Sequence, residues 1–280
     1  VFFFSFFNLF FLQNFFVERQ CLKKLLDLYL TGNPLSGELP SSWSKMEALA
    51  VLSLRGKGIM NISGSLPAEW SALKHLWKLD ISENNISGEL PREWGDMKSL
   101  RYFNANKNSI SGELPPQWAD LSKLWFLQLI GNKISGSIPD QWCGNLPELS
   151  YLYLSQNDLV GEVPICLFNK RSIADLRLNN NQFTGSPLTN PFNAPALQIL
   201  MLQSNRFAGD LSQSLAFDAP LLVSLFLYNN SFSGILPKSI SNMKNLGALI
   251  AHGTLTVILL SLLHYILLLT LSIFCFTFFV

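Results

Sequence analysis

The side chains that could carry out acid–base, nucleophilic or metal chemistry are few and widely separated along the chain. The three histidines are His75, His252 and His264. Two of them lie in or beside an apolar tail, and the acidic residues are spread along the chain without clustering. A catalytic centre needs a nucleophile with its base, or several metal ligands, converging on one point. The sequence therefore predicts a protein that is not an enzyme, with no catalytic residues, no metal site and no cofactor.

The cysteines give little further chemistry. They are Cys21, Cys143, Cys166 and Cys275. Their number and scatter do not suggest a disulfide framework, and the absence of a Cys-x-x-Cys spacing argues against zinc. Cys143 and Cys166 could pair, but we favour reduced, buried thiols.

Charge excludes two classes of partner. The chain has 20 basic and 19 acidic residues, for a formal net charge of +1. Such a balance provides neither the excess positive charge that nucleic-acid binding needs nor a polybasic patch for acidic lipid. We therefore expect no nucleic-acid partner.

Side chains suited to binding rather than catalysis occur in the middle of the chain. Aromatic residues recur there at a constant spacing, with polar residues beside them. Exposed aromatics near an arginine are typical of a protein-binding patch, although scattered aromatics can also stabilise a sheet by stacking. The candidate ligand-binding residues are Tyr102, Trp125, Phe126, Gln128, Tyr151, Tyr153 and Arg177.

These aromatics are positioned by a repeat that covers most of the chain. A Leu-x-x-Leu-x-Leu pattern restarts ten times, at steps of 24 to 27 residues. The starts are Leu25, Leu49, Leu76, Leu100, Leu124, Leu149, Ile173, Leu197, Leu222 and Leu246. This period and pattern are the signature of leucine-rich repeats. We expect an α/β solenoid, a right-handed horseshoe in which each repeat adds one strand to a parallel sheet on the concave face.

Each repeat continues with residues that we interpret as structural. An asparagine follows the second strand leucine by three residues in every complete repeat except the second, and a stacked amide there would satisfy buried backbone groups along the solenoid. A Ser-Gly that follows in most repeats supplies a bend that a Cβ atom would hinder. Three extra residues in the segment 55–60 interrupt the second repeat, and we expect them to break the asparagine ladder.

The repeat unit resembles known families. The Leu-x-x-Asn-x-Leu-Ser-Gly-x-Leu/Ile-Pro pattern over residues 25–249 resembles plant-type extracellular leucine-rich repeats. Five consecutive units also read Leu/Ile-Pro-x-x-Trp, with Trp43, Trp70, Trp94, Trp118 and Trp142, and in this they resemble trypanosomatid surface antigens and related leucine-rich-repeat surface glycoproteins. That resemblance implies display at a cell surface and contact with host molecules. From the residues alone, the tryptophans are best interpreted as a packed column under the convex side.

The two ends of the chain are apolar. Residues 255–280 contain no Asp, Glu, Lys or Arg, and about twenty apolar residues suffice to cross a bilayer as a helix. We expect a C-terminal transmembrane helix, or alternatively a lipid-anchor signal near Gly247 and Ala248. Residues 1–20 form an apolar segment interpreted as a truncated signal peptide or anchor, and residues 21–250 form about nine repeats. The chain begins at Val1 with only Cys21 where plant-type families carry a paired-cysteine cap, which suggests an incomplete gene model.

Three Asn-x-Ser triplets are glycosylation acceptors if the repeats are extracytoplasmic, and they begin at Asn61, Asn85 and Asn229. The expected function is a membrane-attached recognition or display module at the plasma membrane, with extracellular repeats that bind a protein or glycan ligand on the concave face. The alternative is a truncated or decayed repeat fragment of a larger surface antigen or receptor-like protein, without a ligand of its own.

Overall fold

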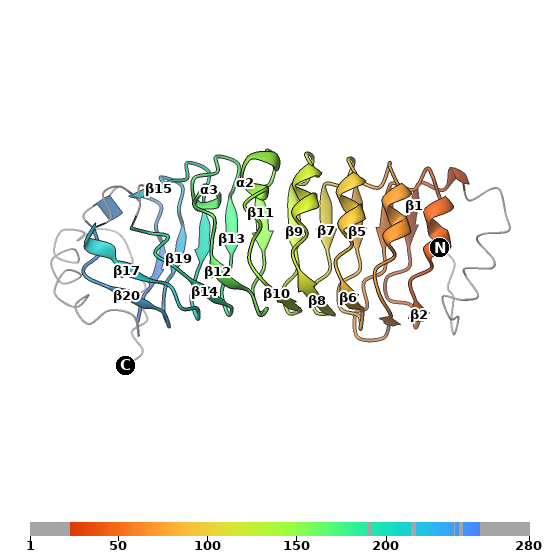
Figure 1. Ribbon diagram of the computed structural model, residues 1–280, viewed down its shortest axis with the longest axis horizontal. Coiled ribbons are helices and arrows are strands. Elements are labelled where there is room, and N and C mark those ends of the chain that lie inside the picture. Colours follow the sequence, from red (N-terminus) through yellow and green to blue (C-terminus); the bar gives the residue numbers. More distant parts are fainter. Residues whose placement is uncertain (1–22, 190–191, 214–216, 238, 241–242, 253–280) are drawn as a thin grey trace. The chain divides into compact units, whose positions relative to one another are not determined.

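The computed structural model describes residues 23–189, 192–213, 217–237, 239–240 and 243–252 (Figure 1). The chain divides into two compact units with a boundary between Asp158 and Leu159, called unit 1 and unit 2 below. Both units are built from the same repeat. The apolar segments 1–20 and 255–280 lie outside the described residues, as do Cys21, His264 and Cys275.

Unit 1 is organised around one row of parallel strands, one from each repeat. In spatial order they are β1 (Asp27–Tyr29), β3 (Val51–Ser53), β5 (Lys78–Asp80), β7 (Tyr102–Asn104), β9 (Phe126–Gln128) and β11 (Tyr151–Tyr153). The central residue of each strand points inward, and its partners are central residues too: Leu79 pairs with Leu52 and Phe103. All three are fully buried. The predicted inward position of the strand leucines is confirmed, and each strand begins two residues after a predicted repeat start.

Unit 2 repeats the arrangement with a parallel row of four strands. They are β13 (Asp175–Arg177), β16 (Ile199–Met201), β19 (Ser224–Phe226) and β21 (Ala248–Ile250). Shorter parallel pairs accompany them: β12 (Val160–Glu162) with β14 (Gln182–Thr184), β15 (Phe192–Asn193) with β18 (Phe217–Asp218), and β17 (Ala208–Asp210) with β20 (Ser231–Ser233). The core of this unit includes a buried stack of Phe183, Phe207 and Phe232, with ring centroids 6.1 and 6.2 Å apart.

The segments that return from one strand to the next contain only short helices. In unit 1 they are the 3-10 helices η2 (Ser41–Lys45), η3 (Ala68–Ala72), η4 (Arg92–Asp96) and η5 (Pro116–Asp120), and the four-residue helix α2 (Trp142–Asn145). Unit 2 has α3 (Ile165–Phe168) and η6 (Leu211–Gln213). The proline that precedes η2, η3, η4 and η5 has an extended backbone, so each helix begins only after it. The helical part of the expected α/β fold is therefore small within the described residues.

Each tryptophan of the Pro-x-x-Trp units lies in one of these helices and is fully buried. The rings of Trp43, Trp70, Trp94 and Trp118 stack with centroids 6.1 to 6.3 Å apart and planes within 6° of parallel. The indole N–H of Trp94 donates to the carbonyl oxygen of Pro67 at 2.9 Å, and Trp118 donates to Pro91 in the same way. The predicted packed column is confirmed, and these bonds join each repeat to the one before it.

A second row of short strands, which the sequence analysis did not anticipate, follows the turn in the first five repeats of unit 1. β2 (Ser36–Glu38) pairs with β4 (Asn61–Ser63), and β8 (Ser109–Glu113) lies between β6 (Ser87–Glu89) and β10 (Lys133–Ser135). Figure 1 shows the main strands, the short helices and these second strands as separate rows. The Ser-Gly motif therefore forms short strands in several repeats, with glycine held at positive φ, as at Gly112 (φ 76°).

The recurrent asparagine has the predicted structural role. The side-chain amide of Asn132 donates to the carbonyl oxygens of Leu129 and Ala105, and its Oδ1 accepts from the backbone N–H of Ile110, all at 3.0 Å. Asn108 makes the equivalent bonds one repeat earlier. Each side chain thus satisfies backbone groups in its own repeat and in the preceding one.

The expected break of this ladder by the segment 55–60 is only partly correct. Lys57 occupies the asparagine position and has a positive φ of 48°. Asn84 of the next repeat nevertheless donates to the Leu54 carbonyl and accepts from the Ile62 N–H. Gly56 permits this because a Cβ there would lie 1.7 Å from the Glu83 carbonyl oxygen. Gly56 therefore packs against the next turn, whereas residues 57–59 are exposed, and the ladder resumes beyond the insertion.

The interpretation of Cys143 and Cys166 as reduced thiols is wrong. Both are disulfide-bonded in the structure. Sequence spacing alone could not decide the matter, because pairing depends on Cα separation and on the direction of the Cβ vectors.

The part of the chain that the structure describes contains no helix that is long and apolar enough to span a membrane. The segment predicted to span it, residues 255–280, is outside that part and stays a prediction.

Candidate ligand-binding face

Six of the seven candidate residues lie in unit 1, on the outer side of its main strands or directly before one of them, and this surface is called the strand face below. Within each of these strands the central residue is buried. In β9 both of its neighbours are partly exposed, whereas β3 and β7 each have one buried neighbour as well. Tyr102, Phe126 and Tyr151 occupy the same position in three adjacent strands, since Phe126 is the register partner of both tyrosines. The parallel register therefore brings together residues that are about 25 apart in the chain.

Five aromatic side chains make one continuous cluster on this face. Tyr102 and Phe126 stack with ring centroids 4.5 Å apart and planes 5° apart. Tyr151 meets Trp125 edge-on at 4.9 Å, and Tyr153 meets Phe126 edge-on at 5.5 Å. Gln128 is the register partner of Tyr153 and lies beside the cluster. We call Tyr102, Trp125, Phe126, Tyr151 and Tyr153 the aromatic cluster.

A cation lies at one end of the cluster. The Lys78 ammonium is 5.2 Å from the centroid of the Tyr102 ring, within the range of a cation–π interaction. Burial raises the pKa of the Tyr102 phenol, and the nearby Asp80 carboxylate raises it further. The phenol is therefore protonated at neutral pH and can donate a hydrogen bond to a ligand.

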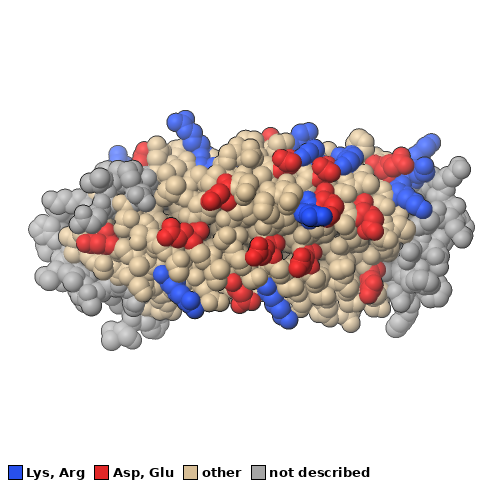
Figure 2. Space-filling view, viewed as in Figure 1, with Lys and Arg blue, Asp and Glu red and all other residues tan. Residues whose placement is uncertain are grey.

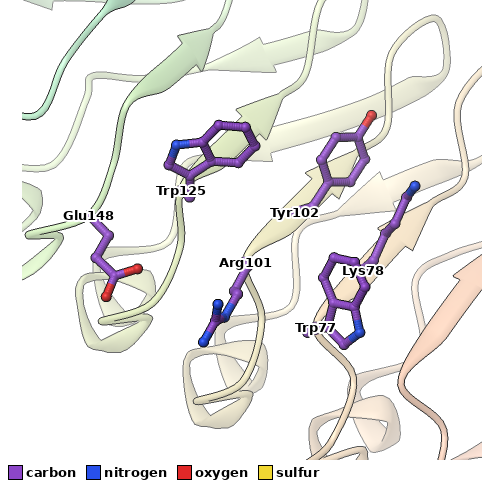
Figure 3. A pocket seen from close by; sticks show the side chains of 6 residues that line it. All are labelled: Trp77, Lys78, Arg101, Tyr102, Trp125 and Glu148. Carbon is purple, nitrogen blue, oxygen red and sulfur yellow. The ribbon is translucent and has the colours of Figure 1, made fainter. Parts of the chain in front are cut away.

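A pocket of about 500 Å³ opens next to the cluster, at the edge where the chain enters the strands (Figure 3). Its lining residues are Trp77, Lys78, Arg101, Tyr102, Trp125 and Glu148. The sequence analysis missed Trp77, Lys78, Arg101 and Glu148. Trp77 and Trp125 each directly precede a strand, so their common position in the repeat was a signal that could have found the pocket.

Arg177 lies on β13 in unit 2, whereas the other six candidates lie in unit 1. Its guanidinium makes a two-pronged contact with Asp175, 2.8 Å from Oδ2 and 3.0 Å from Oδ1. Asp175 is 4% exposed, so the pair stabilises the buried carboxylate.

Charge is mixed on the face of the molecule that Figure 2 shows, where basic and acidic side chains are interspersed without a basic patch. Among the described residues there is no group of three or more His, Cys, Asp or Glu side chains able to hold a metal ion.

The three candidate glycosylation asparagines are all exposed. Asn61 is the first residue of β4, and its Oδ1 accepts a hydrogen bond from the side-chain amide of Asn85. Asn229 lies in the turn after β19 with φ 53°. Their accessibility fits the predicted modification, which the structure does not test.

Three segments of the chain match a known family of repeats. The family model described as Leucine Rich Repeat matches residues 24–46, 75–97 and 221–243. The chain therefore carries leucine-rich repeats. No curated protein matches it, so the resemblance to trypanosomatid surface antigens has no support from that comparison.

The similar solved structures include ectodomains of plant receptors. The chain is 30% identical to the leucine-rich-repeat ectodomain of the membrane receptor kinase GASSHO1/SCHENGEN3 from Arabidopsis thaliana, solved in complex with CASPARIAN STRIP INTEGRITY FACTOR 2, with a TM-score of 0.70 over 85% of this chain and 31% of that one. It is 29% identical to the Arabidopsis receptor kinase HAESA, solved with the peptide hormone IDA and the co-receptor SERK1, with a TM-score of 0.66 over 84% of this chain and 43% of that one. The chain thus spans less than half the length of these two structures.

A plant ice-binding protein shares the fold as well, at 23% identity and a TM-score of 0.61, over 82% of this chain and 81% of that one. At this identity the likeness concerns the fold alone. Because one fold carries such different tasks, function has to be argued from the site.

Proposed function

We propose that the chain is a membrane-attached, extracellular recognition module that binds a protein or glycan ligand on the strand face of unit 1. The observation that carries the proposal is the aromatic cluster beside an open pocket. Aromatic side chains offer large contact areas at little cost in conformational entropy, and they are enriched where binding energy concentrates.

The rest of the site suits recognition rather than catalysis. The Tyr102 phenol and the Gln128 amide are hydrogen-bonding groups within or beside an apolar surface, which is the usual composition of a binding site. The pocket volume of about 500 Å³ falls within the range of small-ligand sites. The similar ectodomains were solved with ligands bound, which supports the same class of function here.

Two observations support an extracellular location. Disulfide bonds such as those of Cys143 and Cys166 persist mainly in oxidising compartments. The three Asn-x-Ser asparagines are exposed, as glycan acceptors have to be. Membrane attachment rests on the apolar segment 255–280 alone.

The test compares a variant changed on the strand face with a control variant changed on η5. Each full chain is held in nanodiscs and exposed to an extracellular extract of the source organism. In the strand-face variant, Tyr102→Ser and Tyr153→Ser remove two rings of the cluster. The control, Gln117→Ser, changes an exposed residue of η5. We expect a species that is retained by the original chain and the control but lost from the strand-face variant, with unchanged circular dichroism. Retention that depends on Gln117 and not on the tyrosines would contradict the proposal.

A further inference from the structure

The pocket is built on three side chains that occupy the same position in three consecutive repeats. The Arg101 backbone N–H donates to the Trp77 carbonyl oxygen at 2.9 Å, and the Trp125 N–H donates to the Arg101 carbonyl oxygen at 2.9 Å. These bonds fix the order Trp77, Arg101, Trp125 along the edge of the sheet. Figure 3 shows Arg101 with Trp125 on one side and Trp77 on the other.

The two indoles remain accessible to a ligand. Trp77 is 43% exposed and Trp125 is 45% exposed, whereas the other five tryptophans are fully buried. A single exposed aromatic on a surface needs no explanation. Two in the same position, separated by one repeat and lining a common pocket, form a binding platform.

The charge of the pocket favours an anion. Arg101 and Lys78 contribute two positive charges, and Glu148 contributes one negative charge. None of the ion pairs between described residues includes Arg101, so its guanidinium is available to a ligand. Guanidinium groups bind carboxylates through two parallel hydrogen bonds.

The spacing favours a saccharide over a peptide. Neighbouring strands lie about 4.8 Å apart, so Trp77 and Trp125 are separated by about 10 Å along the sheet. One strand spacing is close to the length of one pyranose unit in an extended chain, and successive sugars can therefore face successive repeats. An extended peptide rises about 3.3 Å per residue and alternates its side chains, so it does not keep this register. The apolar C–H face of a pyranose also fits the electron-rich face of an indole.

We propose that Trp77, Arg101 and Trp125 form a subsite for an extended anionic oligosaccharide, a chain of uronate pyranoses. Two sugars stack on the indoles, and the carboxylate of the sugar between them binds Arg101. The inference rests on the proposed function of the strand face and names the class of ligand for it.

The experiment measures binding of a 1,4-linked oligogalacturonide to the full chain in nanodiscs, by calorimetry and by tryptophan fluorescence. Only two of the seven tryptophans are exposed, so a fluorescence change on binding reports on this pocket. The comparison probes are the methyl ester of the same oligosaccharide, a neutral cello-oligosaccharide and a poly-glutamate peptide.

The variants separate the parts of the subsite. Trp77→Ala and Arg101→Gln should each raise the Kd by about tenfold, because the first removes a stacking surface and the second removes the charged partner of the carboxylate. Glu148→Gln should lower the Kd, because it removes a repulsive charge. The matched control Arg92→Gln changes an arginine whose side chain is 75% exposed on η4 and should leave the Kd unchanged. Unchanged thermal unfolding checks that each variant is folded.

The following results would contradict the proposed subsite. Equal affinity for the methyl ester or the neutral oligosaccharide overturns the role of charge, and Trp77-dependent binding of poly-glutamate makes the ligand a peptide. If no saccharide binds while the Tyr102 and Tyr153 substitutions still abolish retention of a species from the extract, the inference fails and the proposed function stands. If that retention is absent as well, both fail.

Discussion

Individual side chains in this molecule act mainly by joining neighbouring repeats. Asn132 satisfies two carbonyl oxygens and one backbone N–H, and one of those carbonyls lies 27 residues away at Ala105. These groups are buried or partly buried between repeats, where water cannot replace the lost amide. The asparagine is therefore a connection between repeats as well as a turn residue.

We expect Asn132→Ala to lower the free energy of unfolding by about 1 to 3 kcal/mol, since it removes the acceptor of the Ile110 backbone N–H and one of the two amide donors at each of the Leu129 and Ala105 carbonyl oxygens. The control is Asn33→Ala at the first repeat, where the side chain donates to Leu30 within its own turn. The control substitution should lower the free energy of unfolding by a smaller amount. Urea denaturation followed by circular dichroism measures both, and equal losses would contradict a role between repeats.

For individual residues the sequence was informative where similar residue types recur at the same position of successive repeats. The asparagine ladder, the tryptophan column and the stacking of Tyr102 on Phe126 follow from spacing, because a parallel register turns equal spacing into contact. The bonded cysteines were mispredicted, and the ion pair of Arg177 with Asp175 was not anticipated. Their states depend on a particular partner, such as Asp175, and no periodic signal reveals such a pair.

At the scale of elements, the second row of strands depends on glycine in a specific way. The Glu89 side chain at the end of β6 lies over Gly112 of the next repeat, where a Cβ would come within 2.7 Å of the Glu89 Cγ. Glu113 lies over Gly136 in the same manner. The carboxylate stems thus cover the second strands, and a side chain at the glycine would displace them.

We expect Gly112→Ala to destabilise the protein by about 2 to 3 kcal/mol, from the cost of a positive φ and from the clash with Glu89. Gly32→Ala is the matched control, because Gly32 has nearly the same φ of 77° but no atom within 4 Å of a built Cβ. It should cost about 1 kcal/mol. Adding Glu89→Ala should reduce the cost of Gly112→Ala to that of the control. If the cost is not reduced in the double variant, the clash is not its source.

The main strands could be predicted from the sequence, whereas these second strands could not. A main strand carries an inward leucine flanked by outward residues, which is a readable alternation, as in Lys78–Asp80. A three-residue segment such as Ser87–Glu89 carries no such pattern and becomes a strand through its neighbour in the next repeat. The helices η2, η3, η4 and η5 are also short, because a proline sets where each begins and each spans only five residues.

At the scale of the whole molecule, the proposal joins three features that do not depend on one another: a binding face, bonded cysteines and exposed glycan acceptors. An intracellular protein has no use for the last two, since cytosolic thiols are kept reduced. The binding face alone would suit any compartment. Finding the repeats outside the cell would therefore support a displayed recognition module, and finding them in the cytosol would contradict it.

We expect the chain isolated from its native membrane to carry N-linked glycan at Asn229 and at one or both of Asn61 and Asn85. Treatment with a glycosidase in heavy-oxygen water marks each occupied asparagine for peptide mass spectrometry. In the same sample, a maleimide should label Cys143 and Cys166 only after reduction, because both are disulfide-bonded. Exposed asparagines without glycan, together with thiols that react before reduction, would place the repeats in a reducing compartment. A ligand on the aromatic cluster would then have to be an intracellular one, and the uronate oligosaccharide would no longer be a reasonable candidate.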